Sequence, residues 1–299
     1  MALAYTQISK NKWESGGILL IFMLFVMAVG FLLAEVNSPG GGMVGLIIAA
    51  GISLIWTLIA YFTGDKIALA ANGAKPIQKQ DNPTVYNLVE NLCIAAGLPV
   101  PKIYLIESSA MNAFATGRKP ETASIAVTTG LLQRLEKKEV EGVIAHELSH
   151  IGNYDIRLMM LVAALAGVIM ILTDIFWHWS LHSRGGGGRK SGQLQLIMMV
   201  VGLLLIIFAP LISMLMQLAI SRKREFLADA SGALLTRYPE GLARALEKIS
   251  QDTTPFPTAS HGTAHLYISN PFKKRTWSNL FSTHPPIEAR VKALREMNL

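Results

Sequence analysis

The stretch Ala-His-Glu-Leu-Ser-His-Ile, residues 145–151, decides how the polar part of this chain folds. His146 and His150 are four residues apart, so on a helix both imidazoles project from one face and can chelate one metal ion. Glu147 is rotated by about 100° from His146, so its carboxylate can reach a water molecule beside the metal without becoming a ligand. The spacing predicts a helix with a zinc site, and this helix has an apolar stripe made of Val140, Val143, Ile144, Leu148 and Ile151.

A hydrolytic zinc site needs a third protein ligand and an open fourth position. Glu225 is the strongest candidate, in Ser-Arg-Lys-Arg-Glu-Phe-Leu-Ala-Asp at residues 221–229. Asp229 lies four residues later on the same predicted helix. One carboxylate can bind zinc while the other accepts the N–H of a ligating histidine. The alternative is that Glu225 is a surface acid paired with Arg222 or Arg224.

Composition indicates a membrane protein. Of the 299 residues, 51% are hydrophobic and 16% are charged, against about 25% charged residues in soluble domains. These values exclude a disordered chain and argue against an ordinary soluble enzyme. The single cysteine, Cys93, excludes an internal disulfide scaffold and is compatible with a catalytic domain on the cytosolic side.

Four apolar stretches predict two transmembrane hairpins. Ser15–Ala34, Val36–Gly64 and Ser191–Ser221 lack charged residues, and each reaches the roughly 20 residues that cross a bilayer. Leu158–Thr173 is shorter and becomes long enough if it continues to Trp179, whose ring suits the membrane interface. We therefore expect about four transmembrane helices, with segments 158–179 and 196–220 forming the second hairpin.

The distribution of basic residues predicts the orientation. Nine basic residues near the predicted span ends share one side of the membrane: Lys10, Lys12, Lys66, Lys75, Lys79, Arg157, Arg222, Lys223 and Arg224. The other side has only Arg184, Arg189 and Lys190 in a glycine-rich loop. The side with nine is expected to be cytoplasmic. The net charge of the chain is +7, and the basic residues lie mostly on one predicted side of the membrane. We therefore expect a lipid bilayer as partner and no nucleic acid.

These features divide the chain into four parts. Residues 1–64 are expected to form an N-terminal transmembrane hairpin, and residues 157–221 a second one. Residues 65–156 are expected to form the first part of a catalytic domain, which contains the histidine motif. Residues 222–299 are expected to complete that domain with the third zinc ligand.

The two polar parts have different secondary-structure patterns. Val85–Ala96 is predicted to be a helix, Lys102–Ile106 and Ser124–Thr128 short strands, and Gly130–Gly152 a helical region. The final part is predicted to be mostly helical, with an apolar stripe at Ile287, Val291 and Leu294. The fold class that follows is a mainly helical α+β membrane protein with a small β-sheet.

Four motifs, taken in this order, resemble a known family. They are Met-Asn-Ala-Phe-Ala-Thr-Gly (111–117), His-Glu-Leu-Ser-His (146–150), Arg-Glu-Phe-Leu-Ala-Asp (224–229), and Thr-His-Pro-Pro (283–286) followed by Arg290. Together with the order of hydrophobic hairpins, they cover nearly the whole chain. The chain resembles the HtpX family of membrane-bound heat-shock zinc metalloproteases, which is related to the CAAX prenyl endopeptidases.

The resemblance implies roles for the motif residues in a zincin-like (gluzincin) catalytic domain. One zinc ion per chain would be held by His146, His150 and Glu225, with Glu147 as the general base. Asp229 would be a hydrogen-bond partner of a zinc ligand, namely His146. Substrate backbone would lie beside Asn112, Ala113 and Phe114, where a strand edge can bind an extended peptide. The alternative for Asn112 is a turn residue ahead of a strand.

The resemblance also implies an activity and a location. The activity is hydrolysis of peptide bonds in misfolded or damaged membrane proteins, as part of quality control and the stress response. The location is the cytoplasmic membrane of a bacterium or archaeon, with the N-terminus and catalytic domain in the cytoplasm. Two alternatives are a non-enzymatic zinc-binding membrane scaffold and an intramembrane metalloprotease. No feature of the sequence indicates an oligomeric state.

Other residues are candidates for stabilising the oxyanion or for further metal sites. A donor to the tetrahedral oxyanion is expected, with His284 as the first choice and Arg290 as the second. Their alternatives are a capping or buried histidine and a structural salt bridge. His261 and His265 repeat the four-residue spacing, but nearby glycine and proline residues make loop residues the stronger interpretation.

Overall fold

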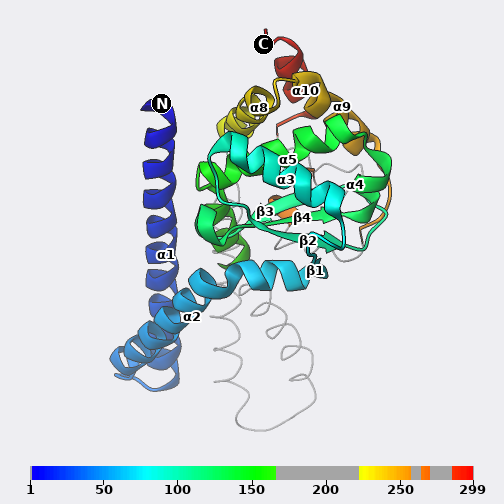
Figure 1. Cartoon of the computed structure of the whole chain (residues 1–299). Helices are drawn as coiled ribbons and strands as arrows, with labels where there is room; N and C mark the ends of the chain where they lie inside the picture. The colour runs from blue at the N-terminus through cyan, green and yellow to red at the C-terminus, as the bar shows by residue number, and fades with distance from the viewer. Residues whose placement is uncertain (1, 166–221, 257–263, 270–284, 299) are drawn as a thin grey trace.

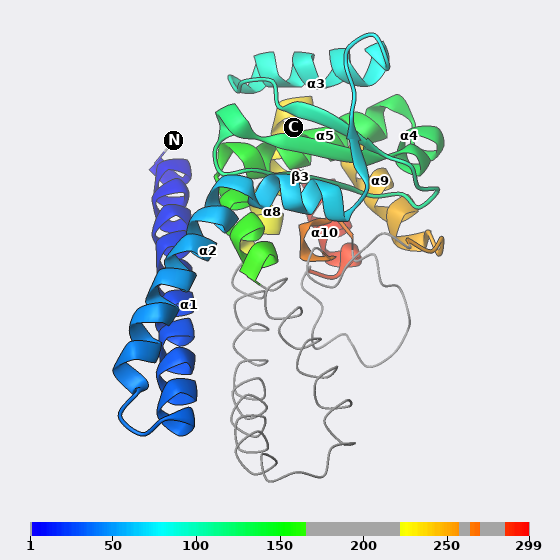
Figure 2. The ribbon, with the colours of Figure 1, turned by 90° about the horizontal axis from the view of Figure 1, so that it is seen from below.

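The computed structural model describes residues 2–165, 222–256, 264–269 and 285–298. Two long helices, α1 (Ala2–Asn37) and α2 (Gly42–Ala71), form an antiparallel hairpin beside a mixed α/β unit (Figures 1 and 2). Both are long and apolar enough to cross a membrane, over Ile8–Val36 and Gly42–Ala71. The predicted first hairpin therefore corresponds to two candidate membrane helices, and α2 continues beyond Gly64 to contact the sheet.

The predicted second hairpin falls almost entirely outside the described residues. Residues 155–165 are helical, and the remainder of segments 158–179 and 196–220 lies in the part of the chain that is not described. Within the described part, Leu158, Val162 and Leu165 pack against Ile18 and Phe22 of α1. The helix that leaves the histidine motif thus runs along the first candidate membrane helix.

Small residues let α1 and α2 approach closely. Gly30 and Ala34 of α1 lie against Gly45 and Ala49 of α2, where a side chain added at either glycine would collide with the facing helix. Small residues four apart are the usual means by which helices pack in a lipid environment.

The sheet has four strands in the order β1-β2-β4-β3: β1 (Ala74–Pro76), β2 (Lys102–Ile106), β4 (Ser124–Thr128) and β3 (Ala113–Thr116). Strands β2 and β4 are parallel, and the two outer strands pair antiparallel to their neighbours. The predicted strands Lys102–Ile106 and Ser124–Thr128 are confirmed as β2 and β4. Strand β3 lies at the edge of the sheet, inside the motif at 111–117.

Both faces of the sheet are buried, and successive residues alternate between two cores. Ile125 and Val127 face a core formed with α3 (Pro83–Ala96) and the helices that follow the sheet. Ala126 between them and Phe114 of β3 face a second core, formed with the end of α2 and the segment 264–267. Because side chains alternate between the two faces of the sheet, β3 lies between this second core and the metal-binding helix α5.

The predicted helical region 130–152 is two helices. Helix α4 (Thr129–Arg134) ends at Leu135, and α5 (Lys137–Gly152) begins after Glu136. Glu136 and Glu139 form a reciprocal capping box, in which each side chain binds the other's backbone N–H. This cap stabilises a new helix start, so α5 is set at its own angle to the sheet.

The C-terminal helices cover α5. They are α8 (Arg222–Thr236), α9 (Pro239–Gln251) and α10 (Ile287–Arg295), with short 3₁₀ helices at Pro120–Thr122 and Ala264–Leu266. In Figure 1, α8, α9 and α10 gather on one side of α5. The predicted stripe on the last helix is confirmed, since Val291 and Leu294 are buried. Residues from both polar parts of the sequence thus share one core.

Candidate active site

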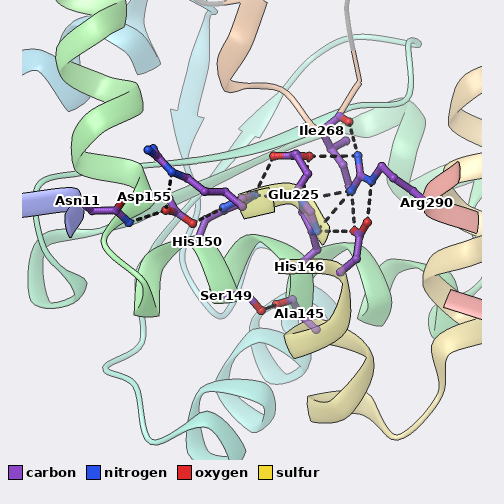
Figure 3. A network of polar contacts seen from close by, with 11 residues as sticks. Asn11, Ala145, His146, Ser149, His150, Asp155, Glu225, Ile268 and Arg290 are labelled. Carbon is purple, nitrogen blue, oxygen red and sulfur yellow. Dashed lines mark hydrogen bonds and ion pairs between the residues drawn. The ribbon is translucent and has the colours of Figure 1, made fainter. Parts of the chain in front are cut away.

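The candidate site is formed between α5 and α8. His146, Glu147 and His150 project from α5, while Glu225 and Asp229 project from α8, and all five are buried. The two helices touch at Gly232, where an added Cβ would lie 2.9 Å from the backbone nitrogen of His146. Because Gly232 has no side chain, the two helices approach closely, and the acids of α8 lie next to the histidines of α5 (Figure 3).

The two histidine rings face each other through their Nε2 atoms, which are 3.1 Å apart. Each Nδ1 is 2.9 Å from a carboxylate oxygen, of Asp229 for His146 and of Asp155 for His150. An ionised carboxylate only accepts hydrogen bonds, so each Nδ1 has to be the protonated nitrogen. Both Nε2 atoms then present lone pairs to one another, an arrangement that requires a cation between them.

Glu225 completes a three-ligand cluster. Its Oε1 is 3.4 Å from Nε2 of His150, and its Oε2 is 3.9 Å from Nε2 of His146. Ligands about 2.1 Å from a tetrahedral ion lie about 3.4 Å from one another. The donor atoms of these three residues lie within 4.8 Å of one another, so this set fits a tetrahedral metal ion.

Local charges shift the pKa values in the site. Burial lowers the pKa of His146 and outweighs the carboxylate of Asp229. Burial alone would lower the pKa of His150 too, but hydrogen bonds to Asp155 and Glu225 raise it well above its ordinary value. The carboxylates therefore attract positive charge to the space between the imidazoles, either a proton or a metal ion.

Glu147 is placed as a proton acceptor. Burial raises the pKa of its carboxyl to about 7, and a hydrogen bond from the backbone N–H of Ala115 in β3 opposes part of that rise. Such a carboxyl can take up and release a proton near neutral pH. The contact also fixes Glu147 next to the edge strand.

Arg290 of α10 is fully buried beside both acids of α8. Its Nε and Nη2 donate to the two oxygens of Asp229, each at 2.7 Å, and its Nη1 is 3.2 Å from Glu225. Burial alone would lower the pKa of the Arg290 guanidinium, but the carboxylates of Asp229 and Glu225 raise it. Sequence reasoning offered either an oxyanion donor or a structural ion pair, and in this geometry Arg290 forms ion pairs.

The residues expected to contact substrate lie at and before β3. The side-chain amide of Asn112 donates to the Ser269 carbonyl at 2.9 Å. The Ala113 carbonyl accepts from the Ile268 N–H at 3.0 Å, and Phe114 stacks edge-on against Tyr267. The segment 267–269 therefore covers the first part of the β3 edge.

Of the other candidate histidines, His265 is the one that the described residues include. His284 and His261 lie outside the described residues. His265 is in the 3₁₀ helix Ala264–Leu266, where it is buried, and its Nε2 lies 3.0 Å from the Met159 carbonyl. The expected loop assignment of His265 is thus replaced by a buried position in the second core.

Sequence reasoning missed Asp155 and Asn11. Asp155 lies five residues after His150, beyond a turn in which Tyr154 has a φ of 62°, and that turn directs the carboxylate back toward the ring. An acid shortly after the second histidine is the signal that was available. Asn11 lies more than a hundred residues away, on α1, and donates to Asp155 at 2.6 Å; no local pattern indicates that contact.

Comparison with known proteins places this chain in a family. Residues 79–298 match Peptidase family M48. The chain belongs to peptidase family M48. Members of M48 are metallopeptidases, and the matched residues include the complete histidine and glutamate cluster and Arg290.

Relatives within M48 align over almost the whole chain. A Protease HtpX homolog of Caldanaerobacter subterraneus is 46% identical over 97% of both chains. A second, of Syntrophobacter fumaroxidans, is 46% identical over 92% of this chain and 97% of its own. A third, of Tropheryma whipplei, is 40% identical over 99% of both. The expected resemblance is confirmed, and this M48 chain is a membrane metalloprotease.

The fold also has a solved M48-type counterpart. The crystal structure of S. mikatae Ste24p matches with a TM-score of 0.52 at 20% identity, over 98% of this chain and 67% of that one. At this identity the likeness concerns the fold. It extends through the helical hairpin as well as the catalytic unit. The expected mainly helical α+β fold with a small sheet is confirmed, and two of the four expected spans correspond to candidate membrane helices in the described residues.

Proposed function

We propose that this M48 chain is a zinc endopeptidase with one zinc ion per chain, held by His146, His150 and Glu225. The observation that carries the proposal is the pair of Nε2 atoms facing each other at 3.1 Å beside Glu225. When bound, zinc supplies a Lewis acid that lowers the pKa of water and polarises a carbonyl group.

Glu147 is the general base of the proposed reaction. Its pKa of about 7 suits a group that removes a proton from the attacking water and then delivers it to the leaving amine. The Ala115 N–H holds this carboxylate toward the side of β3. The position of Glu147 relative to β3 is therefore fixed by its hydrogen bond to the Ala115 N–H.

Asp229 and Arg290 position the metal-binding side chains in this proposal. Asp229 holds the His146 ring by its Nδ1, and Arg290 neutralises Asp229 and Glu225. A partner of this kind fixes the tautomer and orientation of a ligating imidazole. Stabilisation of the oxyanion then falls first to His284, with Arg290 as the second candidate because its guanidinium already binds both acids.

An extended polypeptide is the proposed substrate. Strand edges bind such chains through backbone hydrogen bonds. Because the Ala113 carbonyl is bonded to Ile268, we place the peptide beside the later part of β3, next to Glu147. The substrate edge is then held in place by the residues just before it, which contact residues 267–269: Asn112, Ala113 and Phe114.

The biological setting follows from the relatives and from the two candidate membrane helices. We propose that residues 1–64 and 157–221 form membrane hairpins and that 65–156 and 222–299 form one cytoplasmic catalytic domain. Substrates would be misfolded or damaged membrane proteins at the cytoplasmic face. The intramembrane alternative is disfavoured by the charged start of α5, where the exposed Lys138 pairs with the partly buried Glu141.

The test combines zinc content with casein cleavage, on detergent-purified full-length protein. The parent is expected to hold one zinc and cleave casein, and Glu147→Gln to hold one zinc without cleaving. Glu141→Gln is the matched control, because Glu141 is on the same helix and forms an ion pair with the surface residue Lys138. Zinc without cleavage in the parent would favour the scaffold, and absence of zinc would refute the metal site.

A further inference from the structure

The first turns of α1 contact the turn that follows His150. Asn11 is fully buried although its neighbours Lys12 and Trp13 are exposed. With Ser15, Ile18 and Phe22 it forms a buried stripe along one face of α1. The apolar residues of this stripe pack on the helix that follows Asp155, and Asn11 is the polar residue at its end.

Asn11 binds the turn that ends α5. Its amide nitrogen donates to Oδ1 of Asp155 at 2.6 Å and to the carbonyl of Asn153 at 2.9 Å. The other oxygen of Asp155 accepts from Nδ1 of His150 at 2.9 Å. Figure 3 shows Asn11, Asp155 and His150 as one continuous chain of contacts. Two consecutive hydrogen bonds, between Asn11 and Asp155 and between Asp155 and His150, thus connect α1 to an imidazole whose Nε2 faces Glu225.

Two further contacts attach the same turns of α1 to both metal-bearing elements. Lys12 lies over the ring of Tyr154, with its Nζ 4.6 Å from the ring centre, on the turn that contains Asp155. Glu14 forms an ion pair with Arg224, the residue before Glu225 on α8. One end of α1 therefore binds next to His150 on one side and next to Glu225 on the other.

The type of contact at Asn11 has a clear consequence for the ring. An unrestrained carboxylate can rotate, whereas Oδ1 of Asp155 accepts a hydrogen bond from Asn11 at 2.6 Å and lies 3.8 Å from Nε of Arg224. Asn11 makes the shorter of these two contacts, and with Oδ1 held, the other oxygen is directed toward Nδ1 of His150. A carboxylate that holds a ligating imidazole in this way usually improves metal affinity by 10- to 100-fold. Fixing that carboxylate is a separate contribution, and it comes from the helix that enters the membrane.

We propose that Asn11 is a positioning residue of the metal site: by fixing Asp155, the first candidate membrane helix holds His150 in its metal-binding orientation. This inference rests on the proposed role of His150 as a zinc ligand. It makes α1 a component of the metal centre as well as a membrane anchor.

The experiment measures zinc affinity of full-length protein in detergent, by competition with a chelator of known affinity. Asn11→Leu keeps the branching and the number of heavy atoms of the side chain and removes its hydrogen bonds to Asp155 and Asn153, and we expect it to bind zinc about tenfold more weakly. Asp155→Asn is expected to weaken zinc between 10- and 100-fold. The matched control is Ser9→Leu, a polar-to-leucine change on the exposed face of the same helix, with unchanged affinity.

A double variant tests whether Asn11 acts through Asp155. If it does, Asn11→Leu with Asp155→Asn binds zinc no more weakly than Asp155→Asn alone. The visible spectrum of the cobalt-loaded protein is a second readout, because it reports ligand geometry directly. A purely structural role for Asn11 would lower the unfolding temperature of the metal-free protein and leave affinity and spectrum unchanged.

The outcomes separate this inference from the proposed function. If the parent and Ser9→Leu bind zinc and Asn11→Leu binds it equally well, the positioning role is wrong and the zinc site stands. If the parent binds no zinc, both proposals are wrong. Should Asn11→Leu fail to fold, Asn11→Ser decides by the same comparison, since serine is too short to span the distance to Asp155.

Discussion

At the scale of single residues, the buried guanidinium of Arg290 holds the two acids of α8 in place. Arg290 is fully buried and binds Asp229 through two nitrogens and Glu225 through the third. Two carboxylates in an apolar interior would repel each other and carry a large desolvation cost. Arg290 compensates both, so the acids can stay ionised beside His146.

Replacing Arg290 with methionine tests this compensation. Arg290→Met leaves two buried carboxylates without their cation, and we expect a loss of about 3–5 kcal/mol in the free energy of unfolding. Arg295→Met is the control on the same helix, where Arg295 pairs with Glu240 and Glu247 at the surface and about 1 kcal/mol or less is expected. Equal losses in the two variants, measured by denaturant unfolding, would contradict the argument.

The residues that sequence spacing identified are those related by helical periodicity. His146 and His150 share a face of α5, and Glu225 and Asp229 share a face of α8; a four-residue interval is enough to predict each pair. The distance of 2.9 Å from Asp229 to His146 arises when α8 packs on α5. Asn11 and Asp155 meet only through tertiary packing, which no interval in the sequence encodes.

At the scale of elements, α5 and α8 are brought together by a residue without a side chain. Gly232 faces the backbone of Ala145 and His146, with no room for a Cβ. Asp229 lies about one turn and Glu225 about two turns before Gly232 on α8. The side chains of Glu225 and Asp229 are short, so they contact the histidines only while α8 stays this close to α5.

We expect Gly232→Val to separate the two helices. The added atoms would collide with the main chain of His146 at 2.9–3.2 Å, and overpacking of this kind costs about 1–3 kcal/mol. Zinc affinity should fall together with stability, because both acids of α8 move with the helix. Leu234→Val is the control, an exposed position on the same helix. Normal zinc content and stability in Gly232→Val would show that α8 can shift without disturbing the ligands.

Elements with a strong local signal were predictable, and their interruptions were not. Strands β2 and β4 match the expected ranges because short β-branched runs are bounded by polar residues. Strand β3 was expected only as a strand edge through family resemblance, since Ala-Phe-Ala-Thr carries little periodicity. The break between α4 and α5 depends on the reciprocal hydrogen bonds of Glu136 and Glu139, which end one helix and start another within a continuous helical pattern.

At the scale of the whole molecule, catalytic and membrane parts share interior contacts. Ala68 and Leu69 at the end of α2 join the core behind the sheet, and Tyr267 donates to Asn72 at 2.7 Å. The first candidate membrane helix reaches the metal cluster. We therefore expect the folded unit to respond as a whole to the state of the metal site.

Removing the metal should lower the stability of the entire described unit. At a free zinc concentration 100 times the dissociation constant, binding contributes about 2.7 kcal/mol, which corresponds to roughly 5–10 °C in a domain of this size. We expect the midpoint of thermal unfolding to fall by that amount after chelation. Glu225→Ala, which should not retain zinc, is expected to show no response to the chelator. An unchanged midpoint in the chelated parent would indicate that the metal is not coupled to folding.

The sheet has one short edge strand, β1, and one partly covered edge strand, β3. This has a consequence for how copies of the protein behave in a crowded membrane. An enzyme that captures extended chains is exposed to the risk that its own strands pair with those of a second copy, because a bare sheet edge is a template for aggregation. Here β1 is three residues long and ends at Pro76, and the Ala113 carbonyl of β3 is bonded to Ile268. Within the described residues, these contacts leave the later part of β3, beside Glu147, as the stretch of edge that we propose for substrate. Such an edge can accept a loose polypeptide in transit while offering little surface on which amyloid-like stacking between enzyme molecules could begin.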